Sequence, residues 1–305
     1  MKREQQLFLF QRILKDRAAN TVMKILTFIS LLTLVIMGGG LLYKSSAILS
    51  ARGVWDLITG TEWSPLSGQF GFWPFILSSI YVTILAVLIG VPISLLAALY
   101  LTENAKAWVK KAVFPVLDIL AGIPSVVYGL WGTLIIVPWI ADRFAPHFVE
   151  YSSGYTLLAG GIVLSVMIIP LLVSLFVEMF LTIPSDLKDA SASLGATRWQ
   201  TSRLVVIRKA SPGIIAAIVL SVSKAFGETL AVLMVCGNMV GIPHSLFDSA
   251  YPLSALIANN YGEMLSLPMY ESALMFAALI MFVIIFVFNV IARTVLQRVE
   301  KKFKL

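Results

Sequence analysis

The sequence predicts an all-α integral membrane protein with six transmembrane helices. Hydrophobic residues make up 59% of the 305 residues and charged residues only 13%, whereas an average soluble domain carries about 25% charged residues. Six apolar stretches are each long enough to cross a bilayer as a helix, which takes about 20 residues. The single cysteine, Cys236, cannot form an internal disulfide. This composition argues against a soluble enzyme, a disordered chain and a disulfide scaffold.

The first predicted span needs a separate justification, because it follows a basic segment as the core of a secretory signal does. It is 19 residues long, while a signal core has about 7–15. We therefore interpret residues 25–43 as an uncleaved first helix, preceded by an N-terminal segment, residues 1–24. The six predicted spans are Ile25–Tyr43, Phe75–Leu101, Ala112–Ile140, Thr156–Phe180, Pro212–Gly237 and Ser272–Ile291.

Lysine and arginine gather in alternate connections between these spans. Nineteen of the 23 lie in residues 1–24, in the second and fourth loops, or in the tail 292–305. The opposite loops hold only Lys44, Arg52 and Arg143. The positive-inside rule then places both termini in the cytoplasm. This topology also explains the net charge of +7. We therefore expect membrane lipids around the protein and no nucleic-acid partner.

The two longer outward loops have a different composition. Residues 44–74 contain three tryptophans, Trp55, Trp63 and Trp73, as an interfacial segment with aromatic anchors does. Residues 237–271 carry three prolines and no lysine or arginine. This loop could cap a pathway, contact an external partner or simply connect two spans. The sequence leaves these alternatives open.

The fourth loop, residues 182–211, is longer than a minimal connection and has no flexible-linker composition. Asp186 can cap a short helix that ends before Gly195, a typical helix stop. Thr197 and Gln200 have the spacing of a capping box that opens a second short helix. The first helix has mostly small side chains and one lysine, unlike an amphipathic helix that rests on lipid. We therefore predict a docking element for another protein.

At this loop the sequence resembles a known family. The run from Asp189 to Ala196 is similar to the EAA loop of ABC importer permeases, in which a glutamate-alanine-alanine helix docks on an ATPase subunit. Asp189, Ala190, Ser191 and Gly195 match the motif, with Asp in place of Glu and Ser in place of the second Ala. The resemblance therefore implies that these four residues form the ATPase coupling loop.

Two further stretches narrow the resemblance. Residues 123–132 (IPSVVYGLWG) and 224–232 (KAFGETLAV) look like the corresponding segments of phosphate importer permeases. With the Glu62–Trp63 segment, they resemble the PstC-type subunit more than its PstA-type partner. The resemblance extends from about Trp55 to the C-terminus.

A charge pair lies inside the fifth predicted span. Lys224 is twelve residues after Pro212, about 18 Å along a helix and near mid-bilayer. Glu228 is one turn further, and Ser221 is three residues earlier on the same face. A lone lysine there costs about 2.5–3.5 kcal/mol on insertion scales. Lys224 and Glu228 could pair with each other, but a helical ion pair is weaker when Lys precedes Glu. Each group could instead interact with another helix, a partner subunit or a passing anion.

An anion pathway needs such a group. One fixed cation lowers the barrier for an anion, and a nearby carboxylate keeps the site from becoming a trap. The resemblance implies that Lys224 and Glu228 take part in translocation, and we place Ser221 beside them. The family has arginine where this chain has Lys224, and lysine binds phosphate as a point charge without the planar two-pronged contact.

The resemblance also implies an assembly. It implies a type I ABC importer permease fold in the inner membrane, with a core over residues 75–291. A second, PstA-type permease subunit, two ATPase subunits and a periplasmic phosphate-binding protein would complete the importer. The chain has no Gly-x-x-x-x-Gly-Lys-Ser/Thr loop, so we expect it to be no enzyme and to bind no cofactor or metal, with ATP and Mg²⁺ on the partner ATPases.

Two other functions stay open. One is a permease of the same class for another oxyanion, such as sulfate, molybdate or phosphonate, because Lys224 departs from the phosphate pattern. The other is a stand-alone anion channel or carrier, against which the structured fourth loop argues.

Overall fold

The computed structural model describes residues 2–262 and 268–303. Within them, six helical segments are long and apolar enough to cross a membrane, which confirms the predicted all-helical, six-span class. These segments are Lys15–Lys44, Trp73–Asn104, Ser125–His147, Leu157–Leu181, Arg198–Gly227 and Met269–Val299.

The described chain forms α-helices, one short hairpin and several π- or 3₁₀-helical turns. The α-helices are α1 (Lys2–Lys44), α2 (Ser46–Ala51), α3 (Val54–Thr59), α4 (Trp73–Leu99), α5 (Ala107–Gly122), α6 (Ser125–Trp131), α7 (Val137–Trp139), α8 (Leu157–Leu181), α9 (Ser185–Ser193), α10 (Arg198–Thr201), α11 (Ile207–Gly227), α12 (Leu230–Val235), α13 (Leu253–Asn260) and α14 (Pro268–Phe303). The hairpin pairs β1 (Trp63–Ser64) with β2 (Gln69–Phe70). The π-helical turns are Tyr100–Asn104, Gly132–Ile136, Ile140–Phe144 and Ser202–Val206, and the 3₁₀ turns are Pro65–Ser67 and Ala145–His147.

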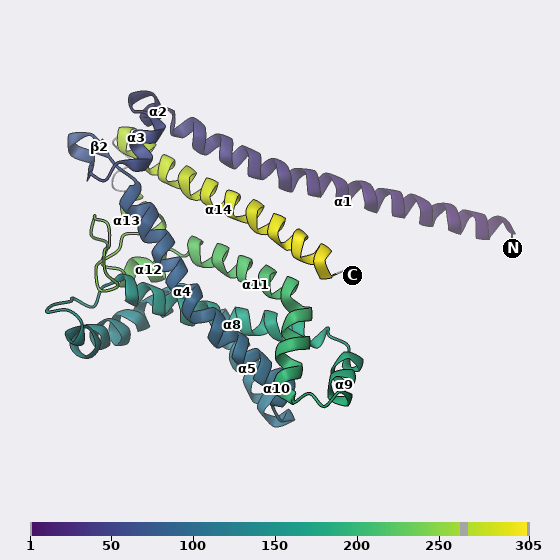
Figure 1. The fold of residues 1–305 in the computed structure, drawn as a ribbon. Coiled ribbons are helices and arrows are strands. Elements are labelled where there is room, and N and C mark those ends of the chain that lie inside the picture. Colours follow the sequence, from purple (N-terminus) through teal and green to yellow (C-terminus); the bar gives the residue numbers. More distant parts are fainter. Residues whose placement is uncertain (1, 263–267, 304–305) are drawn as a thin grey trace.

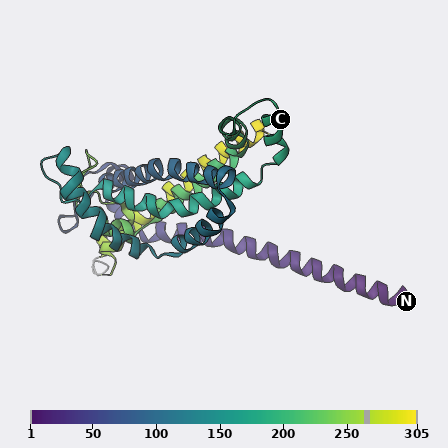
Figure 2. The same ribbon diagram turned by 90° about the horizontal axis from the view of Figure 1, so that it is seen from below.

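The bundle is elongated and has two distinct ends (Figures 1 and 2). One end carries α9, α10 and both chain termini, and we call it the basic end. The opposite end carries the hairpin, α2, α3 and α13, and we call it the hairpin end. This grouping of segments is the one that the lysine and arginine pattern predicts. That the basic end faces the cytoplasm stays a prediction.

Helix α8 lies at the centre of the bundle, packed along α4. Two-thirds of its most apolar window is buried (67%), whereas none of the corresponding window of α1 is. Small residues allow the close approach: a Cβ atom added at Gly90 of α4 would lie 3.1 Å from the Ile168 side chain of α8. Small residues at helix contacts are the usual means of close packing in membranes. Helix α1 instead lies on the outside, where Gly38 faces the Phe282 ring of α14.

An aromatic cluster closes the hairpin end. The Trp63 ring meets the rings of Phe70, Phe72, Phe75 and Tyr270 edge to face, with centroids 5.1–6.0 Å apart. Edge-to-face contacts of this kind stabilise a cluster beyond simple burial. The hairpin, α4 and α14 are thereby joined in a hydrophobic core at this end, separate from the one around α8. Trp63 packs inside this core, while Trp55 is 74% exposed, as an interfacial anchor is.

Two predicted spans and two predicted loop features differ in the structure. The third span is interrupted between α5 and α6, and the fifth between α11 and α12. Hydropathy averages over these breaks because apolar residues continue on both sides. In the fourth loop, Pro184 and not Asp186 is the N-cap residue of α9. The second short helix is not separate either, because α10 continues through Ser202–Val206 into α11.

Candidate functional site

The fifth span breaks at Glu228. Helix α11 ends at Gly227, and Glu228 has an extended backbone with φ −69° and ψ 132°. Gly227 has a low helix propensity, and the β-branched Thr229 two residues later also disfavours a continuous helix. Thr229 is the N-cap of α12, and its hydroxyl donates a hydrogen bond to the Gly227 carbonyl at 3.3 Å. The break therefore places the Glu228 carboxylate between two half-helices.

The third span breaks at Pro124. Proline lacks a backbone N–H and disfavours a helical conformation in the residue before it, and Ile123 is accordingly extended, with ψ 128°. The Tyr128 hydroxyl donates a hydrogen bond to the Leu120 carbonyl at 2.7 Å. The same carbonyl accepts the Ile123 N–H at 3.3 Å, so it stays paired although Pro124 has no N–H to offer it. The break is thus stabilised by the residues around it.

The two half-helices that follow these breaks pack against each other. A Cβ atom added at Gly129 of α6 would lie 3.1 Å from the Cα of Ala231 and 2.8 Å from the Sδ of Met234, both in α12. The Thr133 hydroxyl also donates a hydrogen bond to the Met234 carbonyl at 3.2 Å. The close contact needs a residue without a side chain at position 129. The breaks of the third and fifth spans therefore form one site.

Glu228 lies where three elements meet. Ser125, the first residue of α6, lies near the Glu228 carboxyl group. The Ser254 hydroxyl of α13 donates a hydrogen bond to the backbone carbonyl of Glu228 at 2.8 Å. Sequence reasoning missed both serines. Ser125 directly follows the helix-breaking Pro124, which could have indicated it, whereas nothing in the sequence pairs Ser254 with Glu228.

Lys224 does not form an ion pair with Glu228. Among the residues whose side chains the structure describes, the ion pairs are Lys44–Glu271 at 2.9 Å and Lys188–Glu103 at 2.6 Å. Lys224 is exposed on the outside of this chain, while the next two residues of α11 are buried. Its ammonium group is therefore directed away from the core of the bundle.

Ser221 lies apart from Lys224. It is fully buried, and its hydroxyl donates a hydrogen bond to the Ala217 carbonyl of its own helix at 2.9 Å. The spacing of three residues suggested a shared face. The structure brings together Glu228, Ser125 and Ser254, and it places Ser221 on the inner side of α11.

The fourth loop presents helix α9 at the basic end. Asp189 and Ala190 are exposed, and α9 contains no buried residue. Gly195 follows the helix with a left-handed φ of +79°, as predicted for a helix stop. The predicted capping box is also present: the Thr197 hydroxyl accepts from the Gln200 N–H at 3.2 Å, and the Gln200 side chain accepts from the Thr197 N–H at 2.8 Å.

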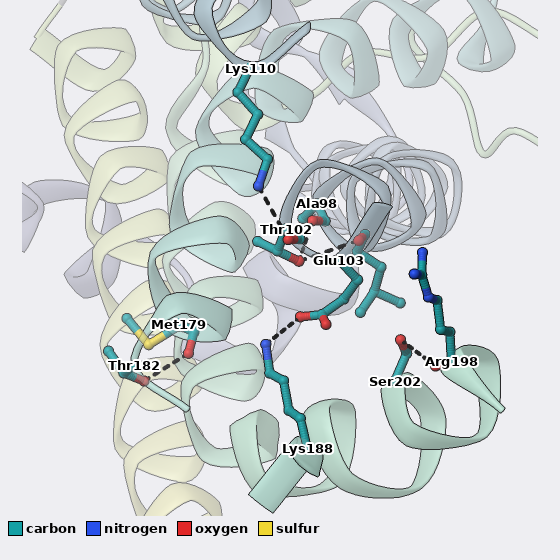
Figure 3. A network of polar contacts seen from close by, with 10 residues as sticks. Ala98, Thr102, Glu103, Lys110, Met179, Thr182, Lys188, Arg198 and Ser202 are labelled. Atoms are coloured by element: carbon teal, nitrogen blue, oxygen red, sulfur yellow. Dashed lines mark hydrogen bonds and ion pairs between the residues drawn. The ribbon is translucent and has the colours of Figure 1, made fainter. Parts of the chain in front are cut away.

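The inner face of α9 makes two side-chain bonds to the bundle. Lys188 donates to Glu103 in the Tyr100–Asn104 turn, and the two side chains point toward each other (Figure 3). The Ser191 and Thr201 hydroxyls are hydrogen-bonded at 2.9 Å. Ser191, which the resemblance assigns to the coupling loop together with the exposed Asp189 and Ala190, is thus half-buried. Sequence reasoning missed Glu103, because 85 residues separate it from Lys188.

The arrangement offers charge and irregular backbone. Within residues 2–262 and 268–303, no group of three or more His, Cys, Asp or Glu side chains could hold a metal ion. Interrupted helices inside a membrane are tolerated where they line a cavity or are covered by protein. Such helices form the substrate sites of many transporters. The two breaks therefore place irregular backbone and the Glu228 carboxyl group at one site, with Lys224 one turn earlier on the outside of α11.

The sequence matches a family model and several known proteins. Residues 90–302 match the family model described as binding-protein-dependent transport system inner membrane component. The chain is 33% identical to the phosphate transport system permease protein PstC of Xylella fastidiosa, over 95% of this chain and 94% of that protein. It is 40% identical to the probable ABC transporter permease protein YqgH of Bacillus subtilis (80% and 78%). It is also 32% identical to a probable PstC of Methanocaldococcus jannaschii (89% and 90%).

Solved structures share the fold at low sequence identity. The bacterial alginate ABC transporter matches with a TM-score of 0.58 and 18% identity, over 90% of this chain and 94% of that one. The MetNI methionine ABC transporter, in an inward-facing conformation, matches with a TM-score of 0.57 and 18% identity, over 78% and 99%. Both are ABC transporters, so the six-span architecture described above is an ABC permease fold.

Proposed function

Because the chain belongs to the family of binding-protein-dependent transport system inner membrane components, we propose that it is the permease subunit of an ATP-driven phosphate importer. The family and the six apolar spans make it a multi-pass inner membrane protein. The observation that carries the choice of phosphate is the likeness to relatives named phosphate permeases, at 32–33% identity over most of the chain. The oxyanion class also fits a fixed lysine inside a span.

We assign the anion pathway to the face of α11 that carries Lys224. About 22 Å of helix separates Lys224 from the basic residue Lys209, so its ammonium group lies well inside the bilayer. Exposure to lipid at such a depth costs about 2.5–3.5 kcal/mol on insertion scales. The cost is avoided if a second, homologous permease subunit of the PstA type covers this face and the anion passes between the two subunits. Lys224 then attracts phosphate as a point charge.

Glu228 completes this site in the proposal. A carboxylate near the cation weakens anion binding, so that phosphate can leave toward the cytoplasm. Ser254 supports this role, because its hydroxyl holds the backbone carbonyl of Glu228 at the helix break. Lys224 and Glu228 together allow entry without tight capture.

Helix α9 is the proposed contact with the motor. Its exposed residues Asp189 and Ala190 would dock on one of two cytoplasmic ATPase subunits, which bind ATP and Mg²⁺. Closure of the ATPases would then move α9 and switch the bundle between outward- and inward-open states. The basic end faces the cytoplasm in this arrangement, and a periplasmic phosphate-binding protein delivers the substrate at the hairpin end.

Competition between oxyanions tests the choice of substrate. The complete complex, reconstituted in lipid vesicles with its binding protein, should import radiolabelled phosphate when ATP is supplied. Unlabelled phosphate should compete at equal concentration, and sulfate and molybdate should not. Equal competition by sulfate or molybdate would assign the permease to another oxyanion.

A further inference from the structure

Helix α9 is held to the bundle by polar bonds. It contains no buried residue, and of its nine residues only Lys188 and Ser191 are even half-buried. Apolar packing, which fixes most helices in place, is therefore weak here. The two half-buried residues are also the two that bond to other elements: Lys188 to Glu103 and Ser191 to Thr201.

The Lys188–Glu103 ion pair is largely covered by protein. Lys188 Nζ lies 2.6 Å from Glu103 Oε1, and the side chains of Lys188 and Glu103 are 28% and 15% exposed. Salt and water screen such a pair less than one on an open surface. The chain itself joins α9 to α8 and α10, whereas this ion pair joins α9 to the end of α4 (Figure 3). The Tyr100–Asn104 turn continues α4, so Glu103 is rigidly attached to that helix.

Helix α4 reaches the Glu228 site near its other end. Its Ser79 hydroxyl accepts a hydrogen bond from the backbone N–H of Leu253 at 2.8 Å. The next residue of α13, Ser254, holds the carbonyl of Glu228. Ser79 and Glu103 are about 36 Å apart along the helix at standard rise. One continuous helical segment thus contacts α9 at the basic end and the support of Glu228 toward the hairpin end.

We propose that the Lys188–Glu103 ion pair transmits the movement of α9 to α4, and that it thereby couples ATP hydrolysis to anion translocation. This inference rests on the proposed function, because it needs an ATPase that moves α9. Lys188 and Glu103 are positioning residues: neither touches the anion or the nucleotide. Without the pair, α9 follows the ATPase while α4 no longer follows α9.

The test measures phosphate uptake and ATP hydrolysis in the same vesicles. Complete complexes that carry Glu103→Gln or Lys188→Gln should import at least about fivefold less phosphate for each ATP hydrolysed. A factor of about five is at the lower end of typical coupling between sites. ATP hydrolysis by these complexes should continue. The exchange Glu103→Lys with Lys188→Glu restores opposite charges and should recover most of the lost uptake per ATP. Single variants with the wild-type ratio would overturn the inference, as would an exchange that recovers nothing.

The second ion pair of the described chain, which is more exposed, supplies a control at the opposite end of the bundle. Lys44 Nζ and Glu271 Oε1 are 2.9 Å apart and join α1 to α14 at the hairpin end. Glu271→Gln should leave the uptake per ATP unchanged. An equal loss in this variant would contradict a specific role for Lys188–Glu103.

The same measurements separate this inference from the proposed function. If the wild-type complex shows no ATP-driven uptake, the proposed function fails. If the wild type imports phosphate and the single variants keep its ratio, only the ion-pair inference fails. Should a single variant lose its ATPase subunits on purification, recovery of assembly by the charge exchange supports the inference and continued loss contradicts it.

Discussion

Gly129 and Ala231 are in direct backbone contact: a Cβ atom at position 129 would lie only 3.1 Å from the Ala231 Cα. This contact joins α6 to α12, the half-helices that follow the breaks at Pro124 and Glu228. The broken spans are thus a single packed unit, and the position of the Glu228 carboxylate depends on how closely the half-helices approach. Small changes at the contact should therefore be felt at the site.

Gly129→Ala should push α6 and α12 apart. Overpacking of this kind costs about 1–3 kcal/mol, and we expect both a lower unfolding temperature in detergent and weaker phosphate uptake. Gly122→Ala is the control, because a Cβ atom at that glycine meets nothing within 4 Å. Equal stability and uptake of the two variants would contradict the close contact.

Ser254→Ala should loosen the backbone at Glu228. The variant removes the donor at 2.8 Å and leaves a partly buried carbonyl without it, at a cost of about 1–3 kcal/mol. We expect reduced phosphate uptake by a complex that still assembles. Ser50→Ala removes an exposed hydroxyl bonded within α2 and should change nothing, so similar losses in both variants would argue against a special role of Ser254.

Gly195→Val should disturb the end of α9. A β-branched residue is strained at a φ of +79°, whereas asparagine tolerates this conformation and occurs at helix ends. We therefore expect Gly195→Val to lower the amount of ATPase that copurifies with the chain, and Gly195→Asn to retain most of it. Full retention in the valine variant would show that the helix end does not shape the docking surface.

Lys224→Ala should abolish most phosphate uptake, because the fixed charge that lowers the barrier for the anion is lost. Lys224→Arg keeps the charge and adds a second prong for phosphate, so it should retain uptake. ATPase copurification serves as the check that the alanine complex assembles. Wild-type uptake by an assembled Lys224→Ala complex would remove the lysine from the pathway.

The spans and the loop signals could be predicted from the sequence because they depend on local patterns. Apolar runs indicate all six spans, and the stop at Gly195 and the Thr197–Gln200 capping box involve residues only a few positions apart. The prediction that Asp186 caps α9 was wrong. Pro184 is the N-cap, because its backbone conformation already suits the residue before a helix. Capping preferences alone do not choose between neighbouring candidates.

The site itself could be predicted only in part. The charges of Lys224 and Glu228 stand out in an apolar span, but the helix break at Glu228 does not, because apolar residues continue on both sides of it. Ser221 has the right spacing for Lys224 only in a simple helix-face argument, and the packing of α11 turns it inward. The contacts of Ser254 with Glu228 and of Lys188 with Glu103 join residues far apart in the chain, so local patterns carry no signal for them.

The account depends most on the claim that this chain is a passive pathway driven by a separate ATPase. Radiolabelled phosphate uptake into vesicles, compared between the complete complex and the purified chain alone, tests this claim most directly. We predict uptake only by the complete complex and only when ATP can be hydrolysed. Uptake by the chain alone, without nucleotide, would contradict the account.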